Sequence, residues 1–275
     1  MRTEQAMNSF LDSRRSRLLS KSTIDTYEWA LTKMAEMYPE ELPQTKDEVQ
    51  RLFIEINGLS PASMRTIWHR LRIFWGWAER EGICANIMSD VSVPVMRRKL
   101  PRILSSPEIM HLLRSTNGQR EYAILAVLLD TGMRVGELAS MTREKVGAEG
   151  ILVSGKTGDR IVPVSQNVLE LLEDQGDERG LWIGCKGRLT GWGLQQIVRR
   201  VMRNAGFKPP KIGPHTLRHT FGVQYIINGG DVFSLQRIMG HQRLTTTMVY
   251  VDMSTELVAR QHAKFSPMAN VMLKI

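Results

Sequence analysis

The chain has 275 residues, of which 42% are hydrophobic and 24% are charged. This composition is typical of globular proteins and excludes a wholly disordered chain, and the length favours two domains. The net charge of +9 lies entirely in the second part: residues 1–95 hold 12 Lys or Arg and 13 Asp or Glu, whereas residues 96–275 hold 25 and 15. A basic domain favours a polyanionic partner such as nucleic acid, although the charge could also serve solubility alone.

The apolar stretches of the sequence are all short. The longest uninterrupted one is Tyr122–Leu129, whereas about 20 apolar residues are needed to cross a bilayer. The first residues also lack the apolar segment of a secretory signal. Cys84 and Cys185 lie far apart without metal-ligand spacing, so we expect free thiols in a protein of the reducing cytoplasm.

Residues 1–92 are predicted to form a helical domain. Ser22 is expected to cap a first helix that begins one residue later. Thr45 and Glu48 have the spacing of a capping box and predict a second helix, which Asn57-Gly58 ends. The apolar residues of both segments recur at helical spacing. They are Ile24, Tyr27, Leu31 and Met34, followed by Val49, Leu52, Phe53 and Ile56.

A third helix of this domain is predicted from Pro61 to Gly82. Arg65, His69 and Arg72 share one of its faces and are candidates to contact DNA phosphates. A solvated face without any partner is the alternative interpretation. The stripe predicted to be buried consists of Ile67, Leu71, Phe74, Trp75 and Ala78.

A basic connector is predicted over residues 93–103. Pro94 and Pro101 frame the run Arg97-Arg98-Lys99, which an extended chain could lay along a DNA backbone. We therefore place the domain boundary here.

The second domain, residues 104–255, is predicted to be mainly helical with one small antiparallel sheet. Residues 151–154 and 160–164 alternate as strands around the turn Gly155–Asp159 and predict a hairpin. Helices are expected to begin near Ser106, before Tyr122, and near Val135, Gln166, Gly193, Pro214, Asp231 and Glu256.

Polar residues that could carry chemistry gather in this basic domain. Each has an ordinary alternative: an ion pair, a solvated lysine, a capping histidine or a core tyrosine. A zinc site is disfavoured, because the pair His215 and His219 lacks the glutamate of the protease motif and no cysteine lies at ligand spacing. The candidates are Arg134, Glu137, Lys156, His215, Arg218, His241 and Tyr250.

Together these residue types have a common chemical logic. Two arginines can neutralise a phosphodiester and stabilise the added charge of its transition state. A tyrosine hydroxyl can attack phosphorus, but its reference pKa of about 10 calls for a neighbouring base such as histidine. A lysine can protonate the leaving 5′ oxygen. This chemistry needs no metal or other cofactor.

In these motifs the sequence resembles the tyrosine recombinases, the family of phage integrases and Xer-type recombinases, which shares its active site with type IB topoisomerases. The first 92 residues resemble the core-binding domain of that family. Two positions depart from its usual pattern: Thr157 replaces a glycine and Met239 a leucine. The matching segments, in the family's order, are Thr131–Leu138, Lys156, His215–Phe221, Met239–His241 and Tyr250.

The resemblance implies a role for each candidate. Arg134 and Arg218 would grip the scissile phosphate, His241 would be a second phosphate ligand, and Glu137 would support the site structurally.

The remaining candidates would act on the protons and on phosphorus. Lys156 would be the general acid, and His215 the base or a phosphate ligand. Tyr250 would be the nucleophile, leaving a 3′-phosphotyrosyl bond and a free 5′ hydroxyl, so that no ATP is needed.

The resemblance also implies an assembly. The two domains would clamp double-stranded DNA at core-type sites, and four protomers would join two duplexes. Residues 256–275 end in Val-Met-Leu-Lys-Ile and would dock on a neighbouring protomer; folding back on their own domain is the alternative. No arm-binding domain is expected before the first helices. An accessory directionality factor or a host factor is a possible further partner. The protein is expected to act in the bacterial cytoplasm, at the nucleoid.

The function implied is that of a minimal integrase of a phage or other mobile element, which the segment Lys264–Pro267 favours. A Xer-type resolvase of chromosome or plasmid dimers is the alternative within the family. A topoisomerase that only relaxes DNA shares the chemistry. A site-specific DNA-binding protein without catalysis is the alternative from another class.

Overall fold

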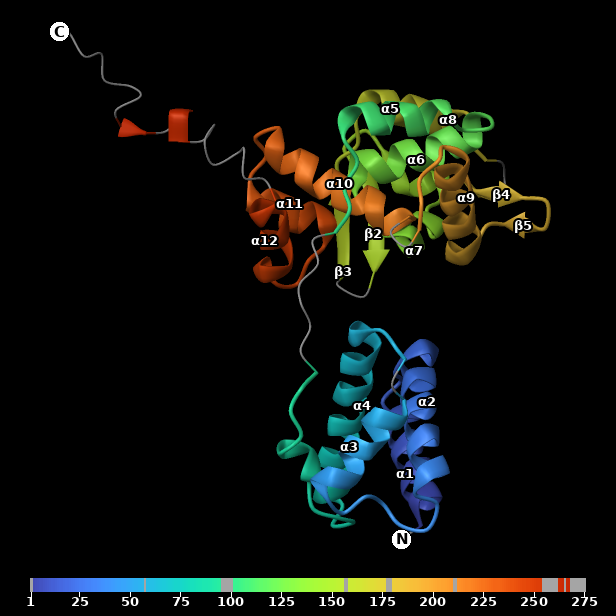
Figure 1. Ribbon diagram of the computed structural model, residues 1–275. Helices are drawn as coiled ribbons and strands as arrows, with labels where there is room; N and C mark the ends of the chain where they lie inside the picture. Colours follow the sequence, from blue (N-terminus) through green and yellow to red (C-terminus); the bar gives the residue numbers. More distant parts are fainter. Residues whose placement is uncertain are drawn as a thin grey trace, which may run out of the picture. The chain divides into compact units, whose positions relative to one another are not determined.

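The computed structural model describes residues 2–56, 58–94, 101–155, 158–176, 180–209, 212–253, 262–264 and 266–267, to which all structural statements refer. The chain divides into two units, Met1–Lys99 and Leu100–Ile275 (Figure 1). The division falls within the predicted connector. Arg97, Arg98 and Lys99 lie outside the described residues, as does the segment after Met253 apart from five residues.

The first unit is a helical bundle with an aromatic core. Phe10 meets Tyr27 and Phe74 edge to face, with ring centroids 5.2 and 5.3 Å apart. The Trp68 indole N–H donates to the Val91 carbonyl at 3.1 Å, which ties the segment after the last long helix to the bundle. The elements are α1 (Thr3–Arg15), α2 (Lys21–Met37), α3 (Lys46–Glu55), α4 (Pro61–Arg80) and the 3-10 turn η1 (Ile87–Ser89).

The capping box predicted at the start of α3 is confirmed. The Glu48 amide donates to the Thr45 hydroxyl at 3.3 Å, and the Thr45 amide donates to the Glu48 carboxylate at 2.9 Å. The stripe predicted along α4 is buried. A capping box and a helical stripe depend only on residues close together in the sequence, so both can be predicted from the sequence alone.

Two expectations for the first unit differ from the structure. The N-cap of α2 is Ser20, because Ser22 already lies in the first helical turn. The Ser20 hydroxyl contacts the Thr23 hydroxyl at 2.8 Å. Helix α1 is absent from the predictions, although Ala6, Phe10 and Leu11 recur at helical spacing and are buried in the structure.

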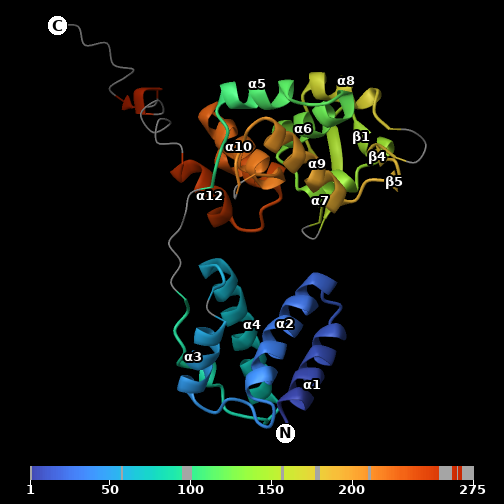
Figure 2. The same ribbon diagram turned by 45° about the vertical axis from the view of Figure 1, so that its right-hand side comes forward.

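The second unit is mainly helical and is built around α6, which packs against α8, α9 and α10, and its short strands lie in two separate places (Figures 1 and 2). Helix α10 packs against both α6 and α12. The helices are α5 (Ser106–Arg114), α6 (Gln119–Thr131), α7 (Val135–Ala139), α8 (Gln166–Glu173), α9 (Gly191–Asn204), α10 (Pro214–Ile227), α11 (Val232–Met239) and α12 (Leu244–Asp252), with the 3-10 turn η2 (Arg143–Lys145).

The predicted hairpin is confirmed and forms part of a three-stranded antiparallel sheet. Strand β2 (Gly150–Gly155) pairs with β1 (Val146–Gly147) and with β3 (Gly158–Val162). A second small pair, β4 (Ile183–Gly184) and β5 (Gly187–Arg188), was not expected from the sequence, because strands of two residues give no periodic signal. Lys156 follows β2 in the sequence and lies outside the described residues.

Helix α7 is too short to be stable alone, and side chains from the β4–β5 region cover its carboxyl end. The Trp182 indole N–H donates to the Leu138 carbonyl at 2.8 Å. One Arg188 nitrogen donates to the carbonyls of Ala139 and Met141, both at 3.0 Å. The last carbonyls of a helix have no hydrogen-bond partner within the helix, and in α7 residues from a distant part of the sequence supply the donors.

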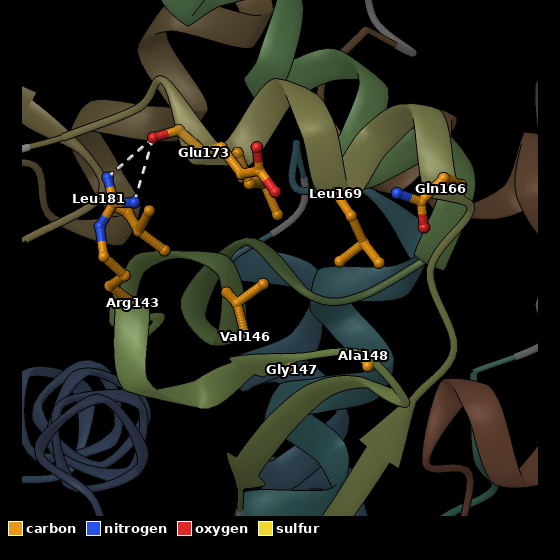
Figure 3. A pocket seen from close by; sticks show the side chains of 9 residues that line it. Arg143, Val146, Gly147, Ala148, Gln166, Leu169, Glu173 and Leu181 are labelled. Carbon is orange, nitrogen blue, oxygen red and sulfur yellow. Dashed lines mark hydrogen bonds between the residues drawn. The ribbon is translucent and has the colours of Figure 1, made fainter.

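In a pocket between η2, β1 and α8, an arginine again binds a carbonyl at the end of a helix (Figure 3). Both terminal nitrogens of Arg143 donate to the Glu173 carbonyl at 3.1 Å, at the end of α8. None of the residues that line this pocket is a candidate from the sequence, and the Arg143 hydrogen bonds join η2 to the end of α8 there.

The described residues show two further properties. None of their helices is long and apolar enough to cross a membrane, and no three of their His, Cys, Asp or Glu side chains gather as a metal site would require. The two cysteines are free thiols, as predicted.

We expect Thr45→Ala to destabilise α3, because the substitution removes the acceptor for the Glu48 amide. The free energy of opening, measured by hydrogen exchange of the α3 amides, should fall by about 1 kcal/mol. Thr45→Asn keeps a side-chain acceptor and is the matched control. An equal loss in both variants would contradict the capping interaction.

Candidate active site

The first candidate, Arg134, lies directly after α6, where the chain turns sharply into α7. Gly132 makes this turn with φ +59°, in the left-handed region that favours glycine, and a Cβ there would overlap the Phe221 ring. Arg134 is the N-cap of α7. Its amide donates to the Glu137 carboxylate at 2.8 Å, and its guanidinium donates to the same carboxylate at 3.1 Å.

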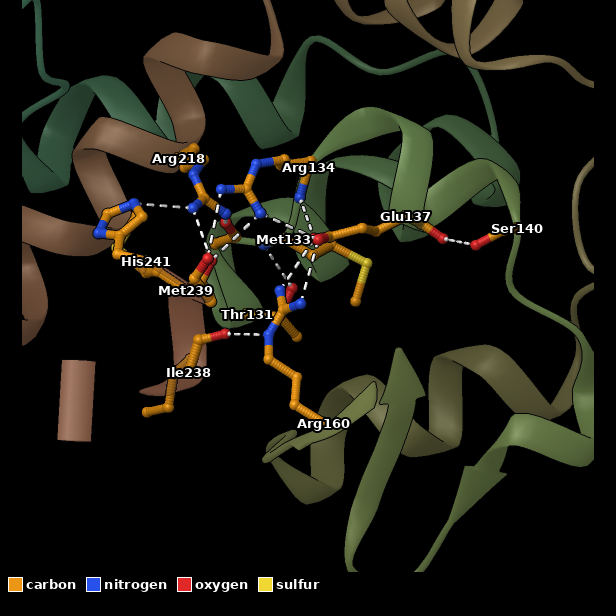
Figure 4. A network of polar contacts seen from close by, with 12 residues as sticks. Thr131, Met133, Arg134, Glu137, Ser140, Arg160, Arg218, Ile238, Met239 and His241 are labelled. Atoms are coloured by element: carbon orange, nitrogen blue, oxygen red, sulfur yellow. Dashed lines mark hydrogen bonds and ion pairs between the residues drawn. The ribbon is translucent and has the colours of Figure 1, made fainter. Parts of the chain in front are cut away.

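Glu137 is buried and is shared by two arginines (Figure 4). Arg160, from β3, donates to both carboxylate oxygens at 3.1 and 2.9 Å. Burial tends to raise the pKa of Glu137, but the hydrogen bonds and charges of Arg160 and Arg134 outweigh it and lower the pKa. Glu137 is therefore ionised at neutral pH and fixes both arginines.

Arg160 is a site residue that the sequence analysis missed. Its Nε also donates to the Ile238 carbonyl at 2.9 Å, so it joins β3, α7 and the end of α11. Gly240 makes room for it, because a Cβ at that glycine would lie 2.8 Å from the Arg160 guanidinium carbon. No local sequence pattern predicts that an arginine in a strand will bind Glu137 and the Ile238 carbonyl, which are far away in the sequence.

Arg218, on α10, is buried and shares one carbonyl partner, Met239, with Arg134. It donates to the carbonyls of Gly132 at 2.5 Å and Met239 at 2.7 Å. Arg134 donates to the carbonyls of Met239 at 3.5 Å and Gly240 at 3.4 Å. Burial, followed by the charge of Arg134, lowers the pKa of Arg218 to about 10. Two guanidiniums that donate to the same carbonyl lie close together, and their like charges favour an anion beside them.

His241 follows the left-handed Gly240 that ends α11, and it is held by two contacts. Arg218 donates to its Nε2 at 2.9 Å. A guanidinium only donates, so Nδ1 carries the proton and donates to the Thr247 hydroxyl at 2.9 Å. Burial, followed by the Arg218 charge, lowers the pKa of His241 to about 4, so the ring is neutral at pH 7.

Tyr250 lies on α12, a helix that the sequence analysis did not predict. The residue is only 3% exposed, and its hydroxyl contacts Nδ1 of His219 at 3.2 Å. Its ring rests on Gly222, where a Cβ would lie 2.9 Å from three ring atoms. Burial raises the pKa of Tyr250, although the charges of Arg218 and Arg134 oppose this shift.

An open cavity lies beside this network. Its described lining comes from α7, β2, the first turn of α10 and the segment between α11 and α12. His215 is exposed and faces this cavity with Arg134 and His241, whereas the histidine in contact with Tyr250 is His219. The structure thus brings together every described candidate of the second domain. Lys156 lies outside the described residues.

The candidates of the first unit surround Trp68 on α4. His69 meets the Trp68 ring edge to face, with centroids 5.0 Å apart, and the Arg72 guanidinium lies over it at 5.2 Å. Arg65 is half-buried, and the other two are exposed. Their contact with DNA stays a prediction, as it does for Arg97, Arg98 and Lys99.

The sequence matches the Phage integrase family over residues 100–256, more than half of the chain. The chain is also 28% identical, over 286 aligned residues, to the tyrosine recombinase XerD of Vibrio cholerae. That alignment covers 91% of this chain and 92% of the relative.

Two solved structures share the fold. The Tn1549 transposon integrase in complex with transposon right end DNA superposes with a TM-score of 0.79 at 19% identity, covering 96% of this chain and 99% of that one. A lambda integrase tetramer bound to a Holliday junction superposes with a TM-score of 0.76 at 18% identity. That superposition covers 89% of this chain and 79% of the lambda integrase chain. The predicted fold class, mainly helical with small antiparallel sheets, is confirmed.

We expect Glu137→Gln to lower the free energy of unfolding at pH 7 by about 3 kcal/mol, because it leaves two arginines without their shared carboxylate. The pKa of Glu137 is lowered in the folded state, so its stabilisation is present above the unfolded pKa. It is lost as the pH falls through the folded pKa.

The test is urea denaturation between pH 7 and pH 3. The difference between the wild-type protein and Glu137→Gln should shrink as the pH falls. Glu144→Gln, at an exposed position one helix later, is the control. A difference that stayed constant with pH would contradict an ionised Glu137.

Proposed function

Because this chain belongs to the phage integrase family of tyrosine recombinases, which break and rejoin DNA at specific sites, we propose that Tyr250 is its nucleophile and that Arg134 and Arg218 hold the scissile phosphate. The observation that carries the proposal is the convergence of two charged guanidiniums beside an open cavity, with the buried tyrosine next to them. A phosphodiester supplies the anion that the two charges favour.

The reaction follows from this arrangement. The Tyr250 oxygen attacks phosphorus, a bond from phosphorus to the 5′ oxygen breaks, and a 3′-phosphotyrosyl bond forms. Arg134 and Arg218 offset the extra negative charge of the transition state, and His215, which lines the cavity, is a further phosphate ligand. His241 also lines the cavity and becomes a phosphate ligand when its Nδ1–H exchanges the Thr247 hydroxyl for a phosphate oxygen. Glu137 holds Arg134 in place. Reversal of the same steps rejoins the strands without ATP.

Lys156 is the proposed proton donor to the 5′ oxygen. The support is its position in the sequence, since Ser154 and Gly155, which precede it on β2, line the cavity. No metal is needed for this chemistry, because the arginines and the lysine supply the charge and the proton.

The proposed partner is double-stranded DNA carrying core-type recombination sites, bound by a homotetramer in the bacterial nucleoid. Among the solved structures of this fold, the Tn1549 integrase is bound to transposon right end DNA and the lambda integrase tetramer to a Holliday junction. We favour integration or excision of a mobile element. The second candidate is Xer-type resolution, which the similarity to XerD over 91% of the chain supports.

We propose further that residues 256–275 dock on a neighbouring protomer. This segment lies largely outside the described residues, and its apolar end Val-Met-Leu-Lys-Ile supports the proposal. An apolar end is more stable when covered by a partner than when exposed to water.

Covalent trapping tests the nucleophile. Nicked duplexes tiled from the DNA that flanks the gene should give an adduct resistant to SDS, and Tyr250→Phe should abolish it without weakening binding. Tyr225→Phe, on α10, is the matched control and should keep the adduct. An adduct that survives in Tyr250→Phe would overturn the assignment, and binding without any adduct would favour the non-catalytic DNA-binding protein.

The position of the trapped site distinguishes the two biological roles. Sites at the ends of a mobile element that carries the gene support the integrase. A single chromosomal or plasmid site that resolves dimers supports the Xer-type enzyme.

Deletion of residues 256–275 tests the docking segment. We expect synapsis of two duplexes, measured by gel shift, to fall at least tenfold, while binding to one duplex persists. Deletion of residues 2–4 serves as a control for shortening the chain. Unchanged synapsis would contradict docking on a neighbour.

A further inference from the structure

We propose that His219 is the general base that takes the proton of Tyr250, a role that rests on the proposed function of Tyr250 as nucleophile. The direct observation is the contact of 3.2 Å between the Tyr250 hydroxyl and Nδ1 of His219. This distance lies at the limit of hydrogen-bond reach that a general base needs. In the sequence His219 belongs to the motif His215–Phe221 and to the disfavoured zinc pair with His215, and neither gives it a part in the cleavage reaction.

The other histidines of the site are engaged elsewhere. The His241 ring is stacked 6.2 Å from the Tyr250 ring, but its Nε2 accepts from Arg218 and its Nδ1 donates to Thr247. Both ring nitrogens are therefore committed to other contacts. His215 lies one turn earlier on α10, is exposed, and faces the open cavity with Arg134.

The surroundings of His219 suit a proton acceptor. Arg218 and His215 face it from its own helix, Tyr250 from α12, and His241 from the loop before α12. Burial is the main cause that lowers the pKa of His219, and electrostatic repulsion from His215 and then from Arg218 adds to it. The His219 ring is therefore neutral at pH 7 and can accept a proton. The same arginine that lowers the pKa of His219 stabilises a phenolate at Tyr250.

The two side chains are also held at a fixed separation. His219 and Gly222 lie one turn apart on α10, and the Tyr250 ring rests on the glycine while its hydroxyl reaches the histidine. A side chain at position 222 would move the ring away. Contact with both residues thus fixes where the hydroxyl lies.

The proton balance closes over one cycle. During cleavage the phenolic proton moves to Nδ1 of His219 as the Tyr250 oxygen bonds to phosphorus, and the released 5′ oxygen takes its proton from Lys156. During rejoining, the 5′ hydroxyl returns its proton to the Lys156 amine and His219 protonates the departing Tyr250 oxygen. No external acid, base or oxidant takes part.

The decisive variant is His219→Asn. Its side-chain oxygen is bonded to Cγ, as Nδ1 is in histidine, so it can accept the Tyr250 hydrogen bond but cannot take the proton. We expect single-turnover cleavage of the trapping duplex at pH 7 to fall by about 100-fold or more. DNA affinity should stay unchanged. His111→Asn, at a histidine that contacts the Ala205 carbonyl away from the site, is the matched control.

One readout, the pH dependence, separates a base from a residue that only positions Tyr250, and a second separates a base from an acid at the leaving group. The defect of His219→Asn should narrow as the pH rises towards the pKa of Tyr250, because solvent then removes the proton. The defect should persist on a duplex with sulfur in place of the bridging 5′ oxygen, since that leaving group needs no proton. A defect that vanishes on the sulfur duplex would place His219 at the leaving group and overturn the proposal.

The outcomes also separate this inference from the proposed function. If the wild-type protein forms no adduct on any duplex, the proposed function fails and the inference fails with it. If the wild-type protein and His219→Asn cleave at the same rate while Tyr250→Phe forms no adduct, only the role of His219 is wrong.

Discussion

The carboxylate of Glu137 is the interaction on which the site depends. It binds Arg134 from its own helix and Arg160 from β3, and Arg160 reaches on to the carbonyl at the end of α11. One buried charge therefore joins three elements that are distant in the sequence. A buried carboxylate is costly unless it is fully paired, so the arrangement is specific: each partner must be present for the others to keep their positions.

The two arginines that we propose as phosphate ligands, Arg134 and Arg218, pose the opposite problem, because their charges repel. Arg218 is held by carbonyl oxygens, whereas Arg134 is held by the Glu137 carboxylate on one side and by carbonyl oxygens on the side that faces Arg218. Arg218 and Arg134 both donate to Met239, at the carboxyl end of α11, where the helix dipole is negative. Carbonyls satisfy the donors without neutralising the charge. The pair keeps its attraction for an anion, which suits a site for the phosphate of DNA.

Much of this could be predicted from sequence, and the physical reason for each failure is clear. The capping box of Thr45 and the turn at Gly132 are local, so neighbouring residues reveal them. The identity of Arg134, Arg218 and Tyr250 as candidates came from residue types in a characteristic order. Arg160, His219 and Gly222 could not be assigned, because their importance lies in contacts with residues 23 to 78 positions away. Helix α12 was missed because its residues, mostly threonine, valine and other strand formers, carry no helical stripe.

The way α7 is capped has a consequence for how the protein opens. Trp182 and Arg188 bind the carbonyls at the end of α7, so the stability of this short helix depends on the β4–β5 region. Transient opening of that small hairpin would fray the helix that carries Glu137. Proteins open in cooperative segments of differing stability, and here one such segment joins a peripheral hairpin to the centre of the site. The order of Arg134 therefore depends on residues about 50 positions further along the chain as well as on the turn in which it lies.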